Sequence, residues 1–561
     1  MAPSPKRNAY SRLPLLLAAA ALALGFNLGG HRLLDPDEGR NAEVAREMAE
    51  SNDYVLPHLS GLPYLDKPVV YFAAAAATME VLGPTETAAR IPALLFTLAT
   101  IAIVVAFARR RFGADAGWLA GIALATMPLV MAYARTTIFD STLAFCTTAA
   151  ILAFWDERPV LAWAAMGLGA LTKGPVALLI PLATVIPHAL LTGVRLRRLV
   201  PWLGLAAFAL VAVPWFAAIT VRIPDFPHYV FVRETLERVT TQSFHRTAPF
   251  WYYVAIIPVA AFPWIIPGLA RVGGGGWRWA WHARRVNAAA GDALLLACWI
   301  LGPLAFFTLN QSKLPQYVLP LMPAFALAAG RALAYDGVAV AWKPYALAAA
   351  LLGAVLVALT WRLPTIRGLT PAELAAIPPA ALAIGLVLIG SAALVALAVR
   401  RLRDRPTLAI TGYAIVVMAI PIAGARVLSA VGEDRSAAAI AAATRAAVGD
   451  SGAVVGISAY PPSLPFYLRH PMHVATPSGR ELTSNFIADH VDRYRAVPDS
   501  PLLPDSAWRT ILRRCAVPTV FVTRTGDQAT RAELGAVLPL LATEGRHAAY
   551  GPCVPTPARG R

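Results

Sequence analysis

Residues 33–68, LLDPDEGRNAEVAREMAESNDYVLPHLSGLPYLDKP, decide the fold because this charged segment stands between two apolar runs. The run before it, 13–30, and the run after it, 87–108, are each close to the about 20 residues that a helix needs to cross a bilayer. A short polar hairpin would be enough to join two such spans. Acids, bases and aromatic residues in so long a connection therefore predict a structured loop that binds or reacts with something.

The composition is that of a multi-pass membrane protein. Of the 561 residues, 57% are apolar, and the mean hydropathy is +0.57. The net charge of +17 might suggest a nucleic-acid partner, but the basic residues gather in short runs at the ends of apolar segments. This is the distribution seen in the cytoplasmic loops of membrane proteins. We therefore expect membrane lipids around the chain and no nucleic acid.

The apolar segments predict a mainly α membrane protein with about thirteen transmembrane helices. Basic clusters at 109–111, 195–198, 271–285 and 400–405 all fall on the side of the N-terminus when the spans are counted. The first loop (31–86) and the C-terminal tail then lie on the opposite side. We expect a membrane domain at 1–428 and a small α/β domain at 429–561. The expected spans are 13–30, 87–108, 116–133, 141–155, 160–172, 175–191, 200–220, 250–270, 291–309, 315–333, 343–360, 379–398 and 407–428.

Local patterns give the elements outside the spans. The first loop should contain a helix that ends near Ser51 and a second helix, 69–82, that is too short to span and lies in the membrane interface. In the tail we expect helices at 435–447 and 530–541 and buried strands at 453–457 and 519–522. Cys515 and Cys553 could form a disulfide if the tail lies outside the cytoplasm.

Polar side chains recur at the ends of the spans on the side of the first loop. Lysine and arginine here, such as Lys67, Arg246 and Lys313, suit a phosphate at the level of the lipid headgroups. A carboxylate such as Asp37 or Glu38 could accept a proton or stabilise a developing oxocarbenium ion. A single polar residue at the end of a span is more often an anchor at the membrane interface or a salt-bridge partner. The occurrence of many such residues on one side predicts a site for group transfer from a lipid-linked phosphate. The set is Asp35, Asp37, Glu38, Arg40, Tyr64, Asp66, Lys67, Arg135, Asp140, Lys173, His245, Arg246, Lys313 and Tyr317.

A divalent cation is a second interpretation of part of this set. Asp66, Asp140 and His245 have the right ligand types, but no spacing in the sequence forces them together. The alternative is that Asp66 pairs with Lys67 and Asp140 with Arg135, and we favour this alternative. No cofactor is required by the sequence beyond this optional metal.

The motifs resemble a known family. They are DPDEGR (35–40), AEVAREM (42–48), GLPYLDKP (61–68), LTKGP (171–175), HRTAPFWYY (245–253) and SKLPQYVLPLMPA (312–324). Together they look like the bacterial branch of the polyprenyl-phosphate-dependent glycosyltransferases with the GT-C fold. This branch includes the lipid A 4-amino-4-deoxy-L-arabinose transferases and protein O-mannosyltransferase-like enzymes. Two positions differ from the pattern, since Asn41 stands where tyrosine is expected and Asp66 where glutamate is.

The resemblance implies roles for individual residues. Asp37 looks like the first-loop acid on which activity depends, with Glu38 beside it. Lys67 looks like a ligand of the donor phosphate, and Tyr64 like a wall of that pocket. The other residues implied to bind substrate are Arg40, Arg246, Lys313 and Tyr317, and those implied to hold a metal are Asp66, Asp140 and His245.

The function implied is transfer of a sugar, with inversion, from undecaprenyl phosphate to lipid A or another glycan on the periplasmic side of the bacterial inner membrane. A protein O-mannosyltransferase-like activity is the nearest alternative. A lipid or solute transporter is less favoured because it needs ionisable groups at the bilayer midplane, whereas here they gather at one face. A non-catalytic scaffold would leave the charged loop unexplained.

Overall fold

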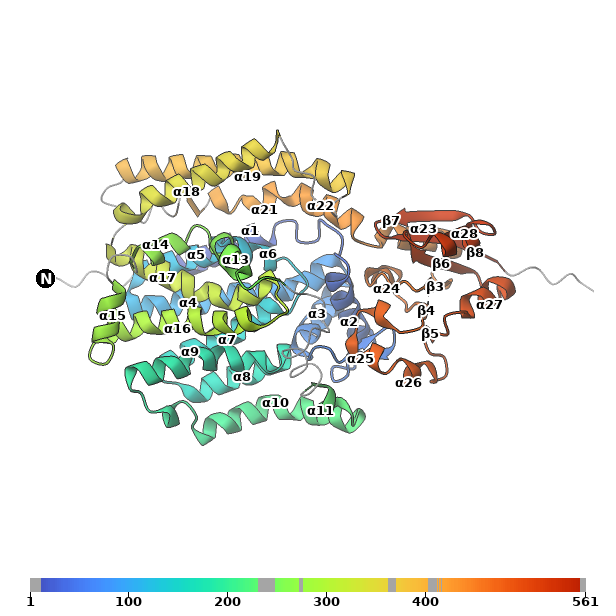
Figure 1. Cartoon of the computed structure of the whole chain (residues 1–561), viewed down its shortest axis with the longest axis horizontal. Helices are drawn as coiled ribbons and strands as arrows, with labels where there is room; N and C mark the ends of the chain where they lie inside the picture. Colours follow the sequence, from blue (N-terminus) through green and yellow to red (C-terminus); the bar gives the residue numbers. More distant parts are fainter. Residues whose placement is uncertain are drawn as a thin grey trace, which may run out of the picture. The chain divides into compact units, whose positions relative to one another are not determined.

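The structure is a computed structural model that describes residues 12–230, 248–271, 276–336, 338–361, 370–401, 411, 413–414 and 416–554. The chain forms two compact units (Figure 1). The first, the membrane unit, comprises Met1–Leu28, Pro92–Arg367 and Ile377–Gly424. The second, the loop–tail unit, comprises Gly29–Ile91, Gly368–Ala376 and Ala425–Arg561. The first loop and the C-terminal residues thus share one unit, and the expected division at 428/429 stays a prediction.

The membrane unit consists of helices. Five described helices are long and apolar enough to cross a membrane: Glu86–Phe112 (α4), Trp202–Arg222 (α10), Ala288–Leu309 (α16), Pro315–Tyr335 (η4 and α17) and Pro371–Arg401 (α19). Shorter apolar helices accompany them, so the chain is a multi-pass integral membrane protein. The remaining helices are α1 (Arg12–Gly25), α5 (Ala114–Thr126), α6 (Pro128–Tyr133), α7 (Asp140–Trp155), α8 (Pro159–Lys173), α9 (Val176–Thr192), η1 (Leu196–Arg198), α11 (Phe226–His228), α13 (Tyr252–Ala260), α14 (Ile265–Arg271), α15 (Trp277–Ala283), α18 (Val338–Leu359) and α21 (Ile420–Ala423).

Small residues let these helices approach closely, as is common in membranes. A Cβ added to Gly330 of α17 would lie 2.6 Å from the carbonyl oxygen of Ala116 in α5. Gly353 of α18 and Gly385 of α19 face each other in the same way, because a Cβ on either would lie 2.6–2.7 Å from the other's carbonyl oxygen. Some predicted spans are interrupted. The span expected at 116–133 divides into α5 and α6 at Pro128, which has no N–H to continue the helix.

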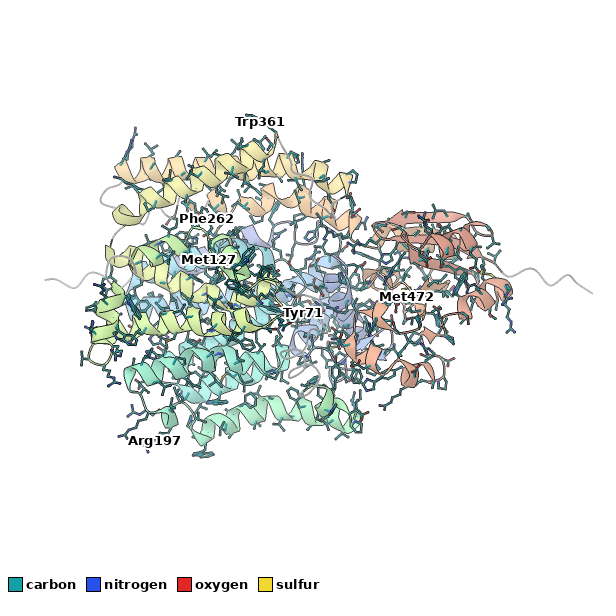
Figure 2. All side chains as sticks on the ribbon, viewed as in Figure 1. Tyr71, Met127, Arg197, Phe262, Trp361 and Met472 are labelled. Atoms are coloured by element: carbon teal, nitrogen blue, oxygen red, sulfur yellow. A yellow bond between two sulfur atoms is a disulfide. The ribbon has the colours of Figure 1, made fainter. Side chains whose placement is uncertain are left out.

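The loop–tail unit begins with the two helices expected in the first loop, α2 (Asp37–Ser51) and α3 (Val70–Leu82). Tyr71 of α3, labelled in Figure 2, is fully buried, and its hydroxyl donates to the carbonyl oxygen of Ala89. Between the helices lies a hairpin that the sequence analysis missed, β1 (His58–Leu59) and β2 (Leu62–Pro63). Its turn is fixed by the buried Glu47, whose carboxylate accepts the backbone N–H groups of the two turn residues.

The tail contains a six-stranded sheet of order β5-β4-β3-β6-β8-β7. The four strands β3 to β6 run parallel, and β8 and β7 are antiparallel at one edge. The predicted strands correspond to β3 and β6, and the first predicted helix to α23. The second predicted helix is shorter than expected and is followed by β7. The bounds are α22 (Ala425–Asp434), α23 (Ala438–Val448), β3 (Ala453–Ile457), α24 (Ser463–Leu468), β4 (His473–Ala475), η5 (Arg480–Leu482), α25 (Asn485–Asp489), α26 (Val491–Arg495), β5 (Leu502–Leu503), α27 (Ala507–Arg514), β6 (Thr519–Arg524), α28 (Gln528–Gly535), β7 (Leu540–Glu544) and β8 (His547–Cys553).

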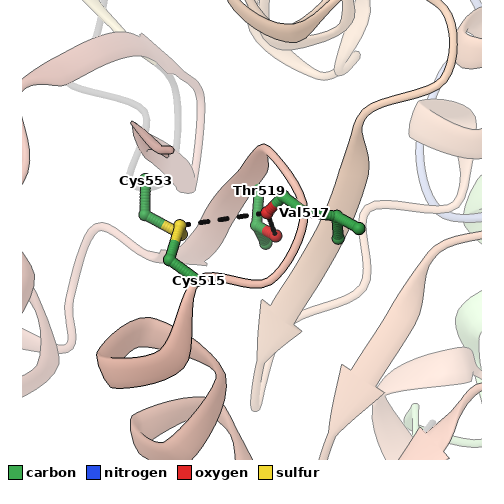
Figure 3. The surroundings of a disulfide bond; sticks show 4 residues. All are labelled: Cys515, Val517, Thr519 and Cys553. Atoms are coloured by element: carbon green, nitrogen blue, oxygen red, sulfur yellow. Dashed lines mark hydrogen bonds between the residues drawn. A yellow bond between two sulfur atoms is a disulfide. The ribbon is translucent and has the colours of Figure 1, made fainter. Parts of the chain in front are cut away.

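Cys515 and Cys553 form a disulfide (Figure 3), as the sequence allowed. It links the end of α27 to the end of β8 and closes a 38-residue separation. Both cysteines belong to the buried apolar cluster of the tail, together with Trp508 and Phe521. Cys146 and Cys298 of the membrane unit are free and buried, as expected of apolar filler.

Candidate active site

The candidate residues divide between the two units, and the first catalytic candidate in the first loop is Asp37. It is the first residue of α2, where a negative charge complements the helix dipole. Its side chain is 42% exposed, and Oδ1 accepts a hydrogen bond from Nη2 of Arg40 at 2.7 Å. Asp37 is therefore a carboxylate that a substrate can reach and whose orientation an arginine fixes.

Arg40 is the centre of this group. Its Cζ lies 5.9 Å from the centroid of the buried Tyr64 ring, and its Nη1 donates to both the carbonyl oxygen and the hydroxyl of Thr483 at 3.1 Å. Burial opposes the charge, but the nearby Tyr64, Asp37 and Asp66 side chains raise the pKa of Arg40 above its ordinary value. The guanidinium thus stays charged beside Asp37.

Glu38, the other candidate acid, is enclosed. Its side chain is 2% exposed, and Nε and Nη2 of Arg90 donate to its two oxygens at 3.0 and 2.8 Å. Arg90 also donates to the carbonyl oxygens of His31 and Arg32. A carboxylate held by a bidentate arginine inside the protein has no room for a substrate, so these contacts favour Asp37 over Glu38 as the reacting acid.

Asp35 connects the DPDEGR motif to the tail. Its two oxygens accept the backbone N–H and the hydroxyl of Ser463 at 2.8 and 2.7 Å, and its own N–H donates to the carbonyl oxygen of Arg435. Burial raises its pKa to about 8, an effect that the Ser463 hydrogen bonds partly offset. A Cβ at Gly39 would lie 2.1 Å from the Asp35 carboxylate and 2.5 Å from the Ser463 nitrogen. Only glycine fits at this motif position.

Asp66 and Lys67 follow the hairpin. The two oxygens of Asp66 accept the backbone N–H groups of Asn485 and Phe486, at the start of α25, at 2.9 and 3.0 Å. Nζ of Lys67 donates to the backbone carbonyl oxygen of Asp66 at 2.5 Å. Asp66 therefore anchors the DKP motif to the tail, and the expected Asp66–Lys67 pair involves the carbonyl group of Asp66.

The membrane unit brings together three further residues of the set. Asp140 begins α7, Lys173 ends α8, and their side chains form an ion pair of 2.5 Å. Nζ of Lys173 also lies 4.9 Å from the ring centroid of Tyr317 in η4, within the range of a cation–π contact. The expected ion pair between Asp140 and Arg135 is wrong. Asp140 pairs with Lys173, and Arg135 donates to the carbonyl oxygens of Leu24 and Asn27.

The remaining substrate-binding candidate in the membrane unit is Lys313. Its ammonium group donates to the carbonyl oxygen of Asn310 at 2.5 Å, and the residue is 7% exposed. Arg246 and His245 lie outside the described residues. Within the ranges that the structure describes, no group of three His, Cys, Asp or Glu side chains could hold a metal ion. The metal set Asp66, Asp140 and His245 stays a prediction.

Sequence analysis missed the tail residues that contact the first loop. Ser463 and Thr483 stand in ordinary polar stretches, PPSLPF and LTSNF, with no motif around them. They are recognisable only because the fold places them beside Asp35 and Arg40 across sequence separations of 428 and 443. Lys173 and Asp140 both belong to the predicted polar set, but their pairing with each other was not predicted.

Comparison with known proteins defines the class. A family model described as dolichyl-phosphate-mannose-protein mannosyltransferase matches residues 66–217. Two solved structures share the fold along nearly the whole chain, with TM-scores of 0.82 and 0.81 and 26% identity. These matches confirm the predicted resemblance to the polyprenyl-phosphate-dependent glycosyltransferases of the GT-C fold, with a helical membrane part and a small C-terminal sheet domain.

The individual relatives are more specific. The solved structures are of ArnT from Cupriavidus metallidurans, bound to undecaprenyl phosphate and in the apo state. The match covers 96% of this chain and 98% of the first structure, and 97% and 98% for the second. The undecaprenyl phosphate-alpha-4-amino-4-deoxy-L-arabinose arabinosyl transferase 1 of Sodalis glossinidius is 33% identical over 342 residues, which is 57% of this chain. That of Pseudomonas aeruginosa is 31% identical over 335 residues, again 57% of this chain. The aligned region spans 59% of the length of each relative.

Proposed function

We propose that this protein is a glycosyltransferase that moves a sugar, such as 4-amino-4-deoxy-L-arabinose, from undecaprenyl phosphate to lipid A or a related periplasmic acceptor. The observation that carries the proposal is the exposed Asp37 carboxylate, held by Arg40 at the start of α2 in the same unit as Lys67. The names of the relatives and the undecaprenyl phosphate bound to one solved neighbour support it.

In the proposed reaction an acceptor oxygen bonds to the anomeric carbon while the bond from that carbon to the phosphate oxygen breaks. Undecaprenyl phosphate leaves with the bonding electron pair, and attack from the opposite face inverts the configuration. From the loop–tail unit we assign Lys67 and Arg40 to the phosphate, whose departing charge cations stabilise. Arg246, Lys313 and Tyr317 of the membrane unit stay predicted substrate-binding residues. Tyr64 would form part of the pocket wall.

The role of Asp37 depends on the acceptor. A hydroxyl acceptor must lose its proton, and Asp37 would accept that proton as a general base. A lipid A phosphate is already deprotonated, so Asp37 would then mainly orient the acceptor and balance charge. Glu38, enclosed by Arg90, would support Asp37 rather than react. The proposed reaction requires no other titratable group to change its protonation state.

We place the protein in the bacterial inner membrane with the loop–tail unit in the periplasm. The basic clusters support this orientation, and so does the Cys515–Cys553 disulfide, because disulfides persist in oxidising compartments. Labelling of an Ala430→Cys variant with a membrane-impermeant thiol reagent checks it. We expect labelling in spheroplasts from outside. Labelling that requires disruption of the membrane would reverse the orientation.

The match to the protein mannosyltransferase model supports a second candidate, transfer of a sugar to a protein hydroxyl. Both are tested with purified protein in lipid nanodiscs. One reaction contains undecaprenyl phosphate-linked aminoarabinose and lipid A, and the other a mannosyl donor and a serine- and threonine-rich peptide. Mass spectrometry should find lipid A heavier by one aminoarabinose and free undecaprenyl phosphate. Sugar on the peptide alone would select the second candidate, and sugar on neither acceptor would contradict both.

A further inference from the structure

Arg40 joins the candidate acid to the tail through one side chain. Nη2 donates to Asp37 at 2.7 Å, and Nη1 donates to the carbonyl oxygen and to Oγ1 of Thr483, both at 3.1 Å. The Nε of Arg40 is buried and has no hydrogen-bond partner among the described residues. Thr483 is therefore the second residue that holds the guanidinium of Arg40 in place. The guanidinium in turn fixes the orientation of the Asp37 carboxylate.

The backbone of Thr483 is strained. Its φ is 56°, in the left-handed region, which is uncommon for any residue but glycine and unfavourable for a β-branched one. Asparagine or glycine would be easier to accommodate there. A threonine at this position is explained if its hydroxyl has a task, and among the described residues this hydroxyl accepts a hydrogen bond from Arg40.

The segment that holds Thr483 is itself well fixed on both sides. Leu482, just before it, is fully buried, and the hydroxyl of Ser484, just after it, accepts the N–H of Ile487 and so caps α25. The first two N–H groups of α25 hold Asp66. Residues 483–486 thus anchor the first loop at two places, one at Arg40 and one at the DKP motif.

We propose that Thr483 is a positioning residue for sugar transfer: by accepting Arg40, its hydroxyl fixes the guanidinium that orients Asp37. Through Thr483 the tail then sets the orientation of the reacting acid, and Thr483 itself does not contact the substrate. This inference rests on the proposed function, because it assigns Asp37 to the transfer reaction. A small error in the placement of a reacting group is costly to the rate, so the effect should lie in kcat.

Three substitutions separate this role from a structural one. Thr483→Val keeps the branched shape and removes the hydroxyl, Thr483→Ser keeps the hydroxyl, and Thr483→Gly removes the hydroxyl while relieving the left-handed backbone. The control is Thr444→Val in α23, a threonine of the same unit whose hydroxyl has no hydrogen-bond partner among the described residues; Thr444 is buried, whereas Thr483 is exposed.

The assay measures kcat and the KM for the donor in nanodiscs, with thermal unfolding of each variant. We expect Thr483→Val to lower kcat by about three- to tenfold, as loss of one typical hydrogen bond predicts, with KM changed less than about twofold. Thr483→Ser should remain within about twofold of wild type. Thr483→Gly should lose kcat as Thr483→Val does, although it unfolds at no lower temperature than wild type. Thr444→Val should match wild type.

Two results would overturn the inference: an unchanged kcat for Thr483→Val, or a loss that serine does not rescue and that follows thermal stability across the three variants. Hydrogen–deuterium exchange of residues 35–44 gives a readout that does not need activity. Thr483→Val should exchange faster there than wild type, and Thr444→Val should not. If wild type transfers no sugar, the proposed function fails, while equal exchange in Thr483→Val and wild type refutes the positioning role itself.

Discussion

The two units hold their candidate acids by different means, although the membrane unit also contains an arginine fork, that of Arg111 on Asp292. In the loop–tail unit, arginines and backbone N–H groups do so: Glu38 accepts two bonds from Arg90, and Asp66 accepts the N–H groups of two residues of α25. In the membrane unit, Asp140 has a single lysine, Lys173, at 2.5 Å. An arginine fork fixes the orientation of a carboxylate, whereas a lysine is a point charge on a flexible stem.

The difference indicates a division of work. The loop–tail unit fixes the direction of each acid: Arg90 encloses Glu38, two backbone N–H groups hold Asp66, and Arg40 holds the partly exposed Asp37. The Lys173–Asp140 pair of the membrane unit balances charge, and the lysine also lies over the ring of Tyr317. The first arrangement suits a group that must meet a reacting atom at a defined angle. The second suits an interaction with a diffuse anion.

The largest expected effect is on Asp37. Asp37→Asn keeps the shape and the hydrogen bond from Arg40 but removes the charge, so sugar transfer should fall by about 10²- to 10⁴-fold with the fold intact. The measurement is the initial rate of lipid A modification, together with thermal unfolding. Glu50→Gln, on the exposed side of the same helix, is the control and should transfer within about twofold of wild type. Near-normal turnover by Asp37→Asn would remove it from the reaction.

The next effect is on stability. Arg90→Ala leaves the enclosed Glu38 without its counter-charge, which should cost about 3–5 kcal/mol of unfolding free energy. Denaturation in detergent, followed by tryptophan fluorescence, measures it. The control is Arg110→Ala, because the Arg110–Asp156 pair is 57% and 28% exposed and should be worth less than about 1 kcal/mol. Equal costs for the two variants would show that the enclosure of Glu38 contributes nothing.

A smaller effect is expected at Lys173, since its side chain is 16% exposed and it is the one ion-pair partner of Asp140 among the described residues. Lys173→Met should destabilise the protein by about 2–3 kcal/mol, and a second change, Asp140→Asn, should restore part of the loss by removing the orphaned charge. The double-mutant cycle gives the coupling energy. A cycle with no coupling would mean that the pair is replaceable and that the contrast between the two units fails.

The smallest effect concerns pH. Burial raises the pKa of Asp35 from 3.8 to about 8, so between these values the folded protein holds a proton that the unfolded chain has lost. The contribution of Asp35 to stability therefore falls as pH rises from about 4 to about 8. Asp35→Asn should flatten the dependence by about 1–2 kcal/mol over pH 5–9, measured by thermal unfolding. Asp492→Asn, at a side chain that is 90% exposed, should leave the slope unchanged. If the stability of Asp35→Asn falls with pH as steeply as that of wild type, the raised pKa of Asp35 is refuted.

The sequence predicted those features whose cause is local. The helical pattern from Asp37 to Ser51 and the apolar runs of β3 and β6 follow from neighbouring residues, and the structure has them close to the expected bounds. The first loop was singled out because a charged segment between apolar runs is unusual, and Asp37 within it because the DPDEGR motif resembles that of the glycosyltransferase family. The hairpin at 58–63 was missed because Ser60-Gly61 is a two-residue turn that we had interpreted only as a break.

Other features could not be predicted because they depend on tertiary contacts. Nothing in DPDEGR says that Glu38 will meet Arg90 and Asp37 will not, although the two acids are adjacent. A helix turns by about 100° per residue, so neighbours face different surroundings, and only the packed structure tells which surroundings these are. The tail residues that anchor the loop were invisible for the same reason.

The anchoring of the first loop by the tail has a consequence for biosynthesis. Asp35 and Ser463 are 428 residues apart, and Arg40 and Thr483 are 443 apart. At a translation rate of about 5–20 residues per second, the loop waits on the order of 20–90 s for its anchors to be made. A ribosome that stalls before residue 483 therefore releases a protein whose acid is not yet oriented. Under the proposed positioning role, copies that end before residue 483 would lack an oriented acid and so would transfer no sugar at the normal rate.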